Sequence, residues 1–249
     1  MKLTQLMTIT KPTAIDQLKE EQLKELQTAL SRLGYPLGDI DGLIGPKTRN
    51  AWAEFKTDVL VGNPTLVDPE SCGTLQQKLD DIDIGEGRVH DFSTKEGTIE
   101  AIKWACKAQD IGLNTQIAYV LATVQWETNR TFKPVKEAYW LDEDWRKNNL
   151  QYYPYYGRGF VQLTWKNNYQ KYSQILGVDL VNDPDKALEN NLALFVLVHG
   201  FKTGTFTGRK ITDYINESQA DFVNARRCIN GTDHAHDIAQ LAKNVLSTL

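Results

Sequence analysis

The sequence predicts a mainly α-helical protein, in which a small helical module precedes an α-rich domain with a small β hairpin. Near the N-terminus, apolar residues at positions 23, 26, 30 and 33 recur at helical spacing. A second run is apolar at positions 117, 120, 121 and 124 and also fits a helix. The helical period breaks over 149–163, where tyrosines and glycines gather and favour a hairpin or an irregular platform.

The first module is predicted over residues 1–65. Its first helix lies within 15–33, and Gly34 follows where a helix C-cap takes a positive φ. Residues 36–46 are dense in Gly, Pro and Asp, which predicts a tight loop. A second helix then starts near Pro46 and presents its apolar face to the first through Ala51, Trp52 and Phe55.

Residues 66–93 are the predicted linker, and residues 94–249 are the second domain. Turn formers and acids dominate the linker, with room for one short helix at 75–79. Helices are predicted in the second domain at 99–108, 115–127, 166–176, 186–199, 220–229 and 234–246, with Gly177, Pro184 and Gly200 at helix ends.

Composition excludes several classes of protein. The 249 residues are 41% hydrophobic and 24% charged, which is typical of a globular chain and not of a disordered, collagenous or membrane-spanning one. The longest apolar runs stop well short of the ~20 residues that a bilayer span needs. The N-terminal segment shows no signal-peptide core, so we expect synthesis in the cytoplasm and export by other means.

The charge balance argues against nucleic acid as a partner. The chain has 28 basic and 32 acidic residues, a net charge of −4. Up to Asp91 there are 10 basic and 15 acidic residues, and the remainder carries 18 and 17. Because neither part has a clustered basic stripe, an uncharged polymer is the simpler expected ligand.

Cysteine and histidine usage predicts no cofactor. Cys72, Cys106 and Cys228 are unclustered, which fits core thiols and not a disulfide framework. His234 and His236 are two residues apart on a predicted helix and therefore point to different faces, so no metal site is predicted. The sequence also lacks a glycine-rich phosphate loop.

Acidic residues could supply general acid–base chemistry. Glu127 ends the apolar helix, where apolar walls would raise its pKa and suit it as a general acid. The alternative on position alone is a helix-end Glu in a solvated salt bridge. Glycoside hydrolysis needs a second carboxylate, and the candidates are Glu137 and the acidic run 142–144, which also fits the first turn of a helix.

Tyrosines, amides and hydroxyls are interleaved over residues 152–169. Such a surface matches sugars, which present apolar C–H faces and a rim of hydroxyl groups. The alternative is that some of these tyrosines form a core around a hairpin and that Arg158 lies in a structural ion pair.

The first module resembles the peptidoglycan-binding domain 1 family, whose members are three-helix modules that attach to bacterial cell walls. The resemblance rests on residues 26–27, 30, 33–35, 38, 41–42, 45–46, 48, 51 and 52–55. These residues mark the fold more strongly than the ligand site, so a purely scaffolding role is an open alternative for each. The residues assigned to this wall-binding module are Tyr35, Asp41, Gly42, Thr48 and Trp52.

Residues 95–248 resemble glycoside hydrolase family 19, which contains chitinases and bacteriophage endolysins. Three separated motifs carry the resemblance: Glu127-Thr128, the run 156–165 with Asn168-Tyr169, and Ile229-Asn230-Gly231. The resemblance implies an α-rich lysozyme-like fold with a cleft between two lobes. It also implies inversion by two carboxylates, with Glu127 as general acid and Glu137 as the base, ~6.5–9.5 Å apart.

The same resemblance implies a substrate-binding set. Gln162, Thr164, Asn168 and Asn230 match positions that hold sugar or the catalytic water, and Arg158 braces the cleft. Thr164 stands where a Ser is common, which preserves the hydroxyl. The complete predicted set is Tyr156, Arg158, Gln162, Thr164, Asn168, Tyr169 and Asn230.

The resemblances together imply a modular peptidoglycan-degrading endolysin of the lysozyme (muramidase) type. Plant chitinases of the family carry their second acid on a longer loop that this chain lacks, which favours peptidoglycan over chitin. We expect a monomer that is released by a holin-type protein and acts in the periplasm or cell wall, without membrane or nucleic-acid partners. A chitinase, a catalytically dead wall-binding protein and an enzyme that cuts the stem peptide are the alternatives.

Overall fold

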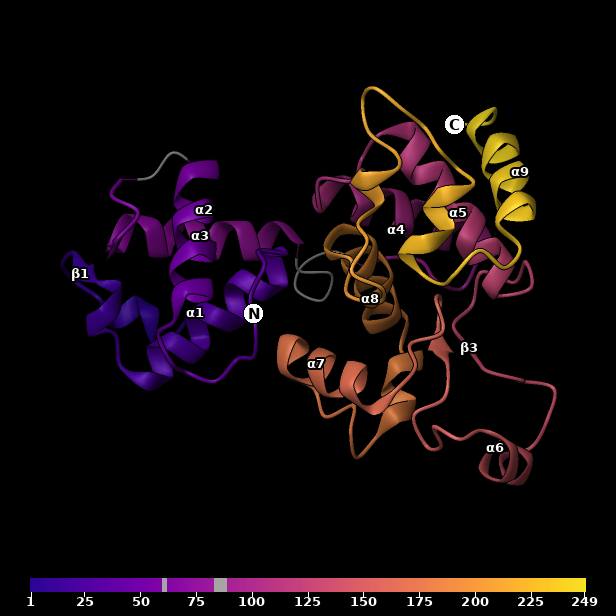
Figure 1. The fold of residues 1–249 in the computed structure, drawn as a ribbon, viewed down its shortest axis with the longest axis horizontal. Coiled ribbons are helices and arrows are strands. Elements are labelled where there is room, and N and C mark those ends of the chain that lie inside the picture. The colour runs from indigo at the N-terminus through magenta and orange to yellow at the C-terminus, as the bar shows by residue number, and fades with distance from the viewer. Residues whose placement is uncertain (60–61, 83–88) are drawn as a thin grey trace. The chain divides into compact units, whose positions relative to one another are not determined.

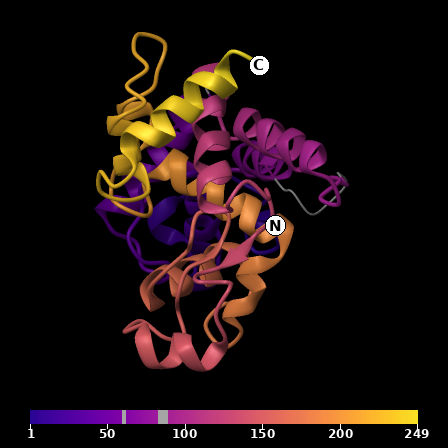
Figure 2. The ribbon, with the colours of Figure 1, turned by 90° about the vertical axis from the view of Figure 1, so that its right-hand side faces the viewer.

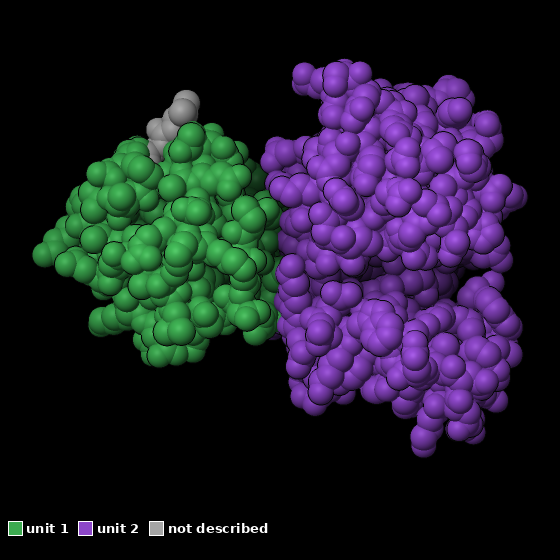
Figure 3. All heavy atoms as spheres, viewed as in Figure 1, with its two compact units in different colours: residues 1–86, 174–176 green, residues 87–173, 177–249 purple. Residues whose placement is uncertain are grey.

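We describe the protein from a computed structural model, in which residues 1–59, 62–82 and 89–249 are described. The chain forms two compact units, residues 1–86 with 174–176 and residues 87–173 with 177–249 (Figure 3). Helices dominate both units, and the strands of the described residues form two short antiparallel pairs. The predicted mainly α class is therefore confirmed.

Unit 1 is built around three helices that bury a compact apolar core (Figure 1). Trp52 is fully buried, stacks on Phe55 with ring centroids 5.2 Å apart, and donates from Nε1 to the Leu66 carbonyl oxygen. Gly34 ends the first helix at φ 93°, as the sequence predicts. The elements are β1 (Thr13–Ala14), α1 (Glu20–Leu33), α2 (Pro46–Asp58), β2 (Leu66–Val67) and α3 (Pro69–Ile82).

Helix α3 corrects the predicted linker over 66–93. Its apolar positions Cys72, Leu75, Leu79 and Ile82 recur at helical spacing, are buried, and pack the helix against α1. Pro69, which resembles a turn residue in the sequence, occupies the first helical position, where its missing N–H costs nothing. Residues 83–88 of the predicted linker lie outside the described residues.

Gln27 organises the glycine-rich loop of unit 1. Its side chain is buried; Oε1 accepts from the Gly42 N–H, and Nε2 donates to Asp41 Oδ1 and Thr48 Oγ1. Of the residues assigned to wall binding, Gly42, Thr48 and Trp52 are buried, which fits the scaffolding alternative. Asp41 is exposed and Tyr35 is half-buried.

Unit 2 surrounds the apolar helix α5, which is buried from Gln116 to Val124. Helix α9 lies along α5 in both ribbon views (Figure 1, Figure 2). Within the described ranges, no helix has both the length and the apolar character needed to cross a bilayer. The helices are α4 (Lys95–Ala108), α5 (Asn114–Glu127), α6 (Glu143–Asn149), α7 (Lys166–Leu176), α8 (Asn190–Thr203) and α9 (Ala235–Leu246).

The sheet of unit 2 differs from the predicted local hairpin. Strand β4 (Arg158–Gly159) pairs antiparallel with β3 (Val135–Lys136), which lies more than twenty residues earlier in the chain. Within the tyrosine-rich segment, only an isolated bridge joins Arg158 to Leu163. Asp185 also ties the two strands, accepting from Lys136 Nζ and Arg158 Nε. Local sequence could not reveal this long-range pairing.

Two helix predictions also need correction. Helix α8 runs through Gly200 and ends at Thr203, where Gly204 takes φ 70°. Only a short 3₁₀ turn, Asn224–Cys228, forms within the predicted helix 220–229.

Gly200 is required by packing and not by a helix end. A Cβ at this position would lie 2.0 Å from Phe206 Cε2. We expect Gly200→Ala to lower the free energy of unfolding by about 1–3 kcal/mol, because the Phe206 ring must move. Denaturant unfolding of the full chain measures this. Gly73→Ala in α3 is the control, because nothing lies within 4 Å of the added carbon; a loss in both variants would contradict the packing argument.

Candidate active site

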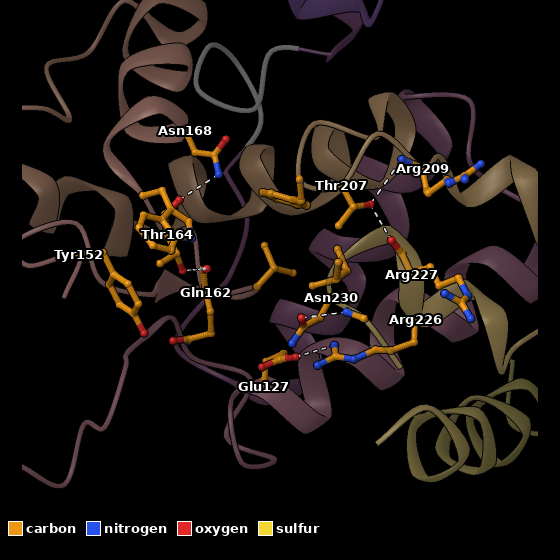
Figure 4. Close-up of a pocket in the computed structure, with 15 residues that line it drawn as sticks. Glu127, Tyr152, Gln162, Thr164, Asn168, Thr207, Arg209, Arg226, Arg227 and Asn230 are labelled. Carbon is orange, nitrogen blue, oxygen red and sulfur yellow. Dashed lines mark hydrogen bonds and ion pairs between the residues drawn. The ribbon is translucent and has the colours of Figure 1, made fainter. Parts of the chain in front are cut away.

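A cavity of about 640 Å³ opens in unit 2 between two groups of side chains. One group comes from the segment around β4 and from α7, and the other from the end of α5, the loop after α8 and the 3₁₀ turn at 224–228 (Figure 4). The cavity is lined by Glu127, Tyr152, Val161, Gln162, Thr164, Trp165, Asn168, Phe206, Thr207, Arg209, Arg226, Arg227, Ile229, Asn230 and Gly231.

Glu127 lies at the last position of α5, where the buried helix reaches the cavity. Its Oε1 accepts from Arg226 Nη1 at 2.7 Å, and its side chain is 16% exposed. The Arg226 side chain is 5% exposed, and its Nε donates to the Asp233 carbonyl oxygen. The partly buried ion pair fixes the direction of the carboxylate. The sequence predicts apolar surroundings for Glu127, and the structure adds this charged partner.

Glu137 is held at the edge of the same cavity without lining it. Its Oε1 accepts from the Tyr152 hydroxyl at 2.7 Å, and its Oε2 accepts from the Gly157 N–H at 2.9 Å. Tyr152 lines the cavity on the side opposite Glu127 (Figure 4). Burial and the bond to Glu137 raise the pKa of Tyr152 to about 12, so the phenol keeps its proton and remains a donor at neutral pH.

Gly157 allows Glu137 and Gln162 to approach the same stretch of backbone. A Cβ there would lie 2.5 Å from Gln162 Oε1 and 3.2 Å from Glu137 Oε2. The second carboxylate and a cavity-lining amide are therefore neighbours across this glycine. A larger residue at 157 would push one of them away.

The other acidic candidates are placed differently. Asp142 caps α6 by accepting from the Trp145 N–H, as the sequence predicts for a helix start. Glu143 accepts from the Tyr156 hydroxyl and pairs with Arg146. Neither of these two residues lines the cavity.

Four residues of the predicted substrate-binding set line the cavity. Gln162 has a left-handed backbone, with φ 58°, and so does Trp165, with φ 73°. The Thr164 hydroxyl donates to the Gln162 carbonyl oxygen, and the Asn168 side-chain amide donates to the Thr164 carbonyl oxygen (Figure 4). These bonds connect the segment at 162–164 to the first turn of α7. Asn230 lines the cavity from the group of side chains that also contains Glu127 and Arg226. Backbone strain at non-glycine residues is common in functional sites.

The other three members of that set are buried away from the cavity. Tyr156 and Tyr169 are 0% exposed, and Arg158 is 3% exposed. The Arg158 guanidinium lies 3.7 Å from the Tyr156 ring centroid and donates to the Tyr169 hydroxyl. Burial by itself would raise the pKa of Asp185, yet bonds from Lys136 and Arg158 hold that pKa below its ordinary value. These three residues are buried behind the residues that line the cavity, and the place of Arg158 fits the bracing role that the resemblance implies.

Sequence reasoning missed Arg226 and Tyr152 as partners of the two carboxylates. Arg226 is 99 residues from Glu127 along the chain. Tyr152 belongs to the tyrosine-rich segment 152–169, but nothing in that segment indicates which tyrosine contacts Glu137. The sequence gives no local signal for Arg226, because its burial follows from tertiary packing.

The comparisons with known proteins agree with this organisation. Residues 19–58 match the family described as putative peptidoglycan binding domain, and residues 116–205 match the family described as chitinase class I. Along the chain, the match to the peptidoglycan-binding family therefore precedes the match to the chitinase class I family. The second matched range begins in α5 and includes Glu127, Glu137, Gln162 and Asn168.

Curated relatives match this chain over short segments, which are less than a fifth of their own length. Chitinase 11 of Oryza sativa subsp. japonica is 52% identical over 42 residues, which cover 17% of this chain and 16% of that protein. The inactive chitinase-like protein 1 of Hevea brasiliensis is 46% identical over 41 residues, 16% of this chain and 13% of its own. The crystal structure of chitinase C from Streptomyces griseus HUT6037 matches 69% of each chain with 18% identity and a TM-score of 0.39.

Proposed function

We propose that the chain is a peptidoglycan-degrading lysozyme that hydrolyses the β-1,4 bond between N-acetylmuramic acid and N-acetylglucosamine. The observation that carries the proposal is the Glu127 carboxylate in the cavity, held by Arg226, together with Glu137, which is bonded to the cavity-lining Tyr152. The match of residues 19–58 to a peptidoglycan-binding family supports the choice of polymer. The family matches support glycan hydrolysis at the level of a glycoside hydrolase.

In the proposed mechanism, Glu127 protonates the glycosidic oxygen as the bond to the leaving sugar breaks. Glu137 accepts a proton from a water molecule that attacks the anomeric carbon from the opposite face, so the configuration inverts. The Tyr152 hydroxyl and the Gly157 N–H fix the orientation of the Glu137 carboxylate beside the cavity. Gln162, Thr164, Asn168 and Asn230 offer amide and hydroxyl groups to the sugar.

The module is the reason to favour peptidoglycan over chitin. A tethered second binding site turns catalysis on an insoluble wall into an effectively intramolecular event and raises the local concentration of enzyme. The roles of a phage endolysin, action in the periplasm or wall, and release by a holin-type protein belong to the same proposal.

The nearest competing function is a chitinase with the same acid–base chemistry. The matching rice protein is named a chitinase, and the matching Hevea protein is named inactive, so a wall-binding protein without catalysis is also a defined alternative. The presence of Glu127 in the cavity and of Glu137 beside it, bonded to the cavity-lining Tyr152, argues against the inactive form.

Mass spectrometry of products from purified peptidoglycan, reduced with borohydride, tests the proposal. Reduced N-acetylmuramic acid ends are the expected result. Reduced N-acetylglucosamine ends would indicate a glucosaminidase. New free amines without new reducing ends would indicate cleavage of the stem peptide, and the absence of any product, with wall binding intact, would overturn the enzymatic assignment.

Arg226 offers a test of how Glu127 is positioned. We expect Arg226→Lys to lower kcat/KM about 10- to 100-fold, because an ammonium cannot hold both the carboxylate and the Asp233 carbonyl in the planar geometry of a guanidinium. Initial rates on a soluble oligosaccharide measure the effect. Arg49→Lys, in an exposed residue of unit 1 that pairs with Asp16 and does not line the cavity, is the control and should leave this rate unchanged; equal losses would contradict the positioning role.

A further inference from the structure

A second cavity lies on another face of unit 2, between the end of α5 and helix α9. It has a volume of about 510 Å³ and shares no lining residue with the candidate active site. Trp126 lines it, and Glu127, the next residue, lines the active-site cavity. Successive residues of a helix point about 100° apart, so the end of α5 serves both cavities. The second cavity is lined by Gln125, Trp126, Asn129, Arg130, Asp237, Gln240 and Leu241.

The lining has the chemistry that sugars need. Trp126 is 36% exposed and is braced by the His234 ring at a centroid distance of 4.8 Å, which leaves an aromatic surface toward solvent. Three amide side chains, Gln125, Asn129 and Gln240, offer donors and acceptors together. An aromatic platform beside a few convergent polar groups binds a ring that has one apolar face and a rim of hydroxyls and acetamido groups.

Further exposed rings extend this surface. Asn129 Nδ2 donates to the Tyr139 hydroxyl at 3.2 Å. Tyr139 is 49% exposed, and Trp140, 71% exposed, packs edge-on against it with centroids 5.2 Å apart. Large exposed aromatic side chains that gather and are joined by an amide mark an interaction surface, whereas scattered ones need no explanation.

We propose that the α5–α9 cavity is a second glycan-binding site for N-acetylated sugar chains. The inference rests on the proposed function, which it deepens by giving the hydrolase domain its own hold on the polymer. A chain held here while another stretch occupies the active site stays at a high effective concentration between cleavage events. The lining carries Arg130 and Asp237 together, so it favours neither sign of charge and suits an uncharged glycan.

Hydrogen exchange with mass spectrometry on the full chain tests the site, with the N-acetylglucosamine hexamer as the probe. The Glu127→Gln variant serves as the parent so that the probe is not cut. We expect added protection of amides at 125–130 and 235–246, besides those of the active-site segment 158–168. Asp237→Asn combined with Gln240→Ala should weaken binding at the second site about tenfold, since two polar partners are lost.

A matched control separates this site from other effects. His236→Ala combined with Lys243→Ala changes exposed residues of the same helix that do not line the cavity, and should leave the protection unchanged. Absence of protection at 235–246, or full protection in the Asp237/Gln240 variant, would overturn the proposal. Hydrolysis by the unmutated chain is read separately: protection at α9 with no cleavage of any glycan would contradict the proposed function and still support the second site.

Discussion

Replacing Glu127 with Gln is expected to lower kcat by at least about 10³-fold, near the upper part of the range for a general acid. The amide keeps the size of the side chain but cannot give a proton to the leaving oxygen. Its carbonyl oxygen can still accept from Arg226, so the fold and the geometry of the pocket should persist. Rates on soluble oligosaccharide and on purified walls measure the loss.

Binding of the Glu127→Gln variant to insoluble walls is the control for this experiment, because the module on residues 19–58 is untouched. Wall binding and thermal unfolding should match the unmutated chain. A variant that retains a tenth of the original turnover would exclude Glu127 as the general acid.

Replacing Glu137 with Ala is expected to lower kcat by about 10²- to 10⁴-fold, because no group is left to take the proton of the attacking water. The truncation also leaves space beside Tyr152 and Gly157, whose donors then face a cavity. Azide should restore part of the rate, because a small anionic nucleophile needs no base. The product should be a glycosyl azide of inverted configuration, which NMR identifies.

Glu143→Gln is the matched control, because this residue is the other acidic candidate with structural partners. Its pair with Arg146 involves a carboxylate that is 48% exposed, and exposed pairs contribute about 0–1 kcal/mol, so the rate should change by less than about fivefold. If Glu143→Gln instead abolished turnover and Glu137→Ala did not, the roles of the two acids would be exchanged.

Patterns over short stretches of sequence predicted much of this protein correctly. Helical spacing of apolar residues located α1, α5 and α9, because a helix buries the residues that recur every three to four positions. Gly34 and Gly177 were correctly placed at helix ends, where both adopt a left-handed backbone. Glu127 was placed at the end of a buried helix by the same periodicity.

The errors in the sequence analysis share a physical origin. Gly200 resembled a helix end, but its lack of a side chain accommodates the Phe206 ring. Residues 69–82 resembled a linker, but they fold because α1 offers an apolar face to cover. Tyr156 and Tyr169 were assigned to the substrate-binding set, but both are buried and pack around the Arg158 guanidinium. Each error concerns what a residue packs against.

Patterns within a few residues predicted the helical class, most helix positions and the place of Glu127 at the end of a buried helix, whereas the family resemblance singled out Glu137 among the other acidic candidates. Tertiary packing brings Arg226 to Glu127, Tyr152 to Glu137, and β3 to β4. These contacts join positions far apart along the chain. They form when packing brings distant elements together and repays the entropy of closing the loops between them, and no short pattern of residues records that outcome.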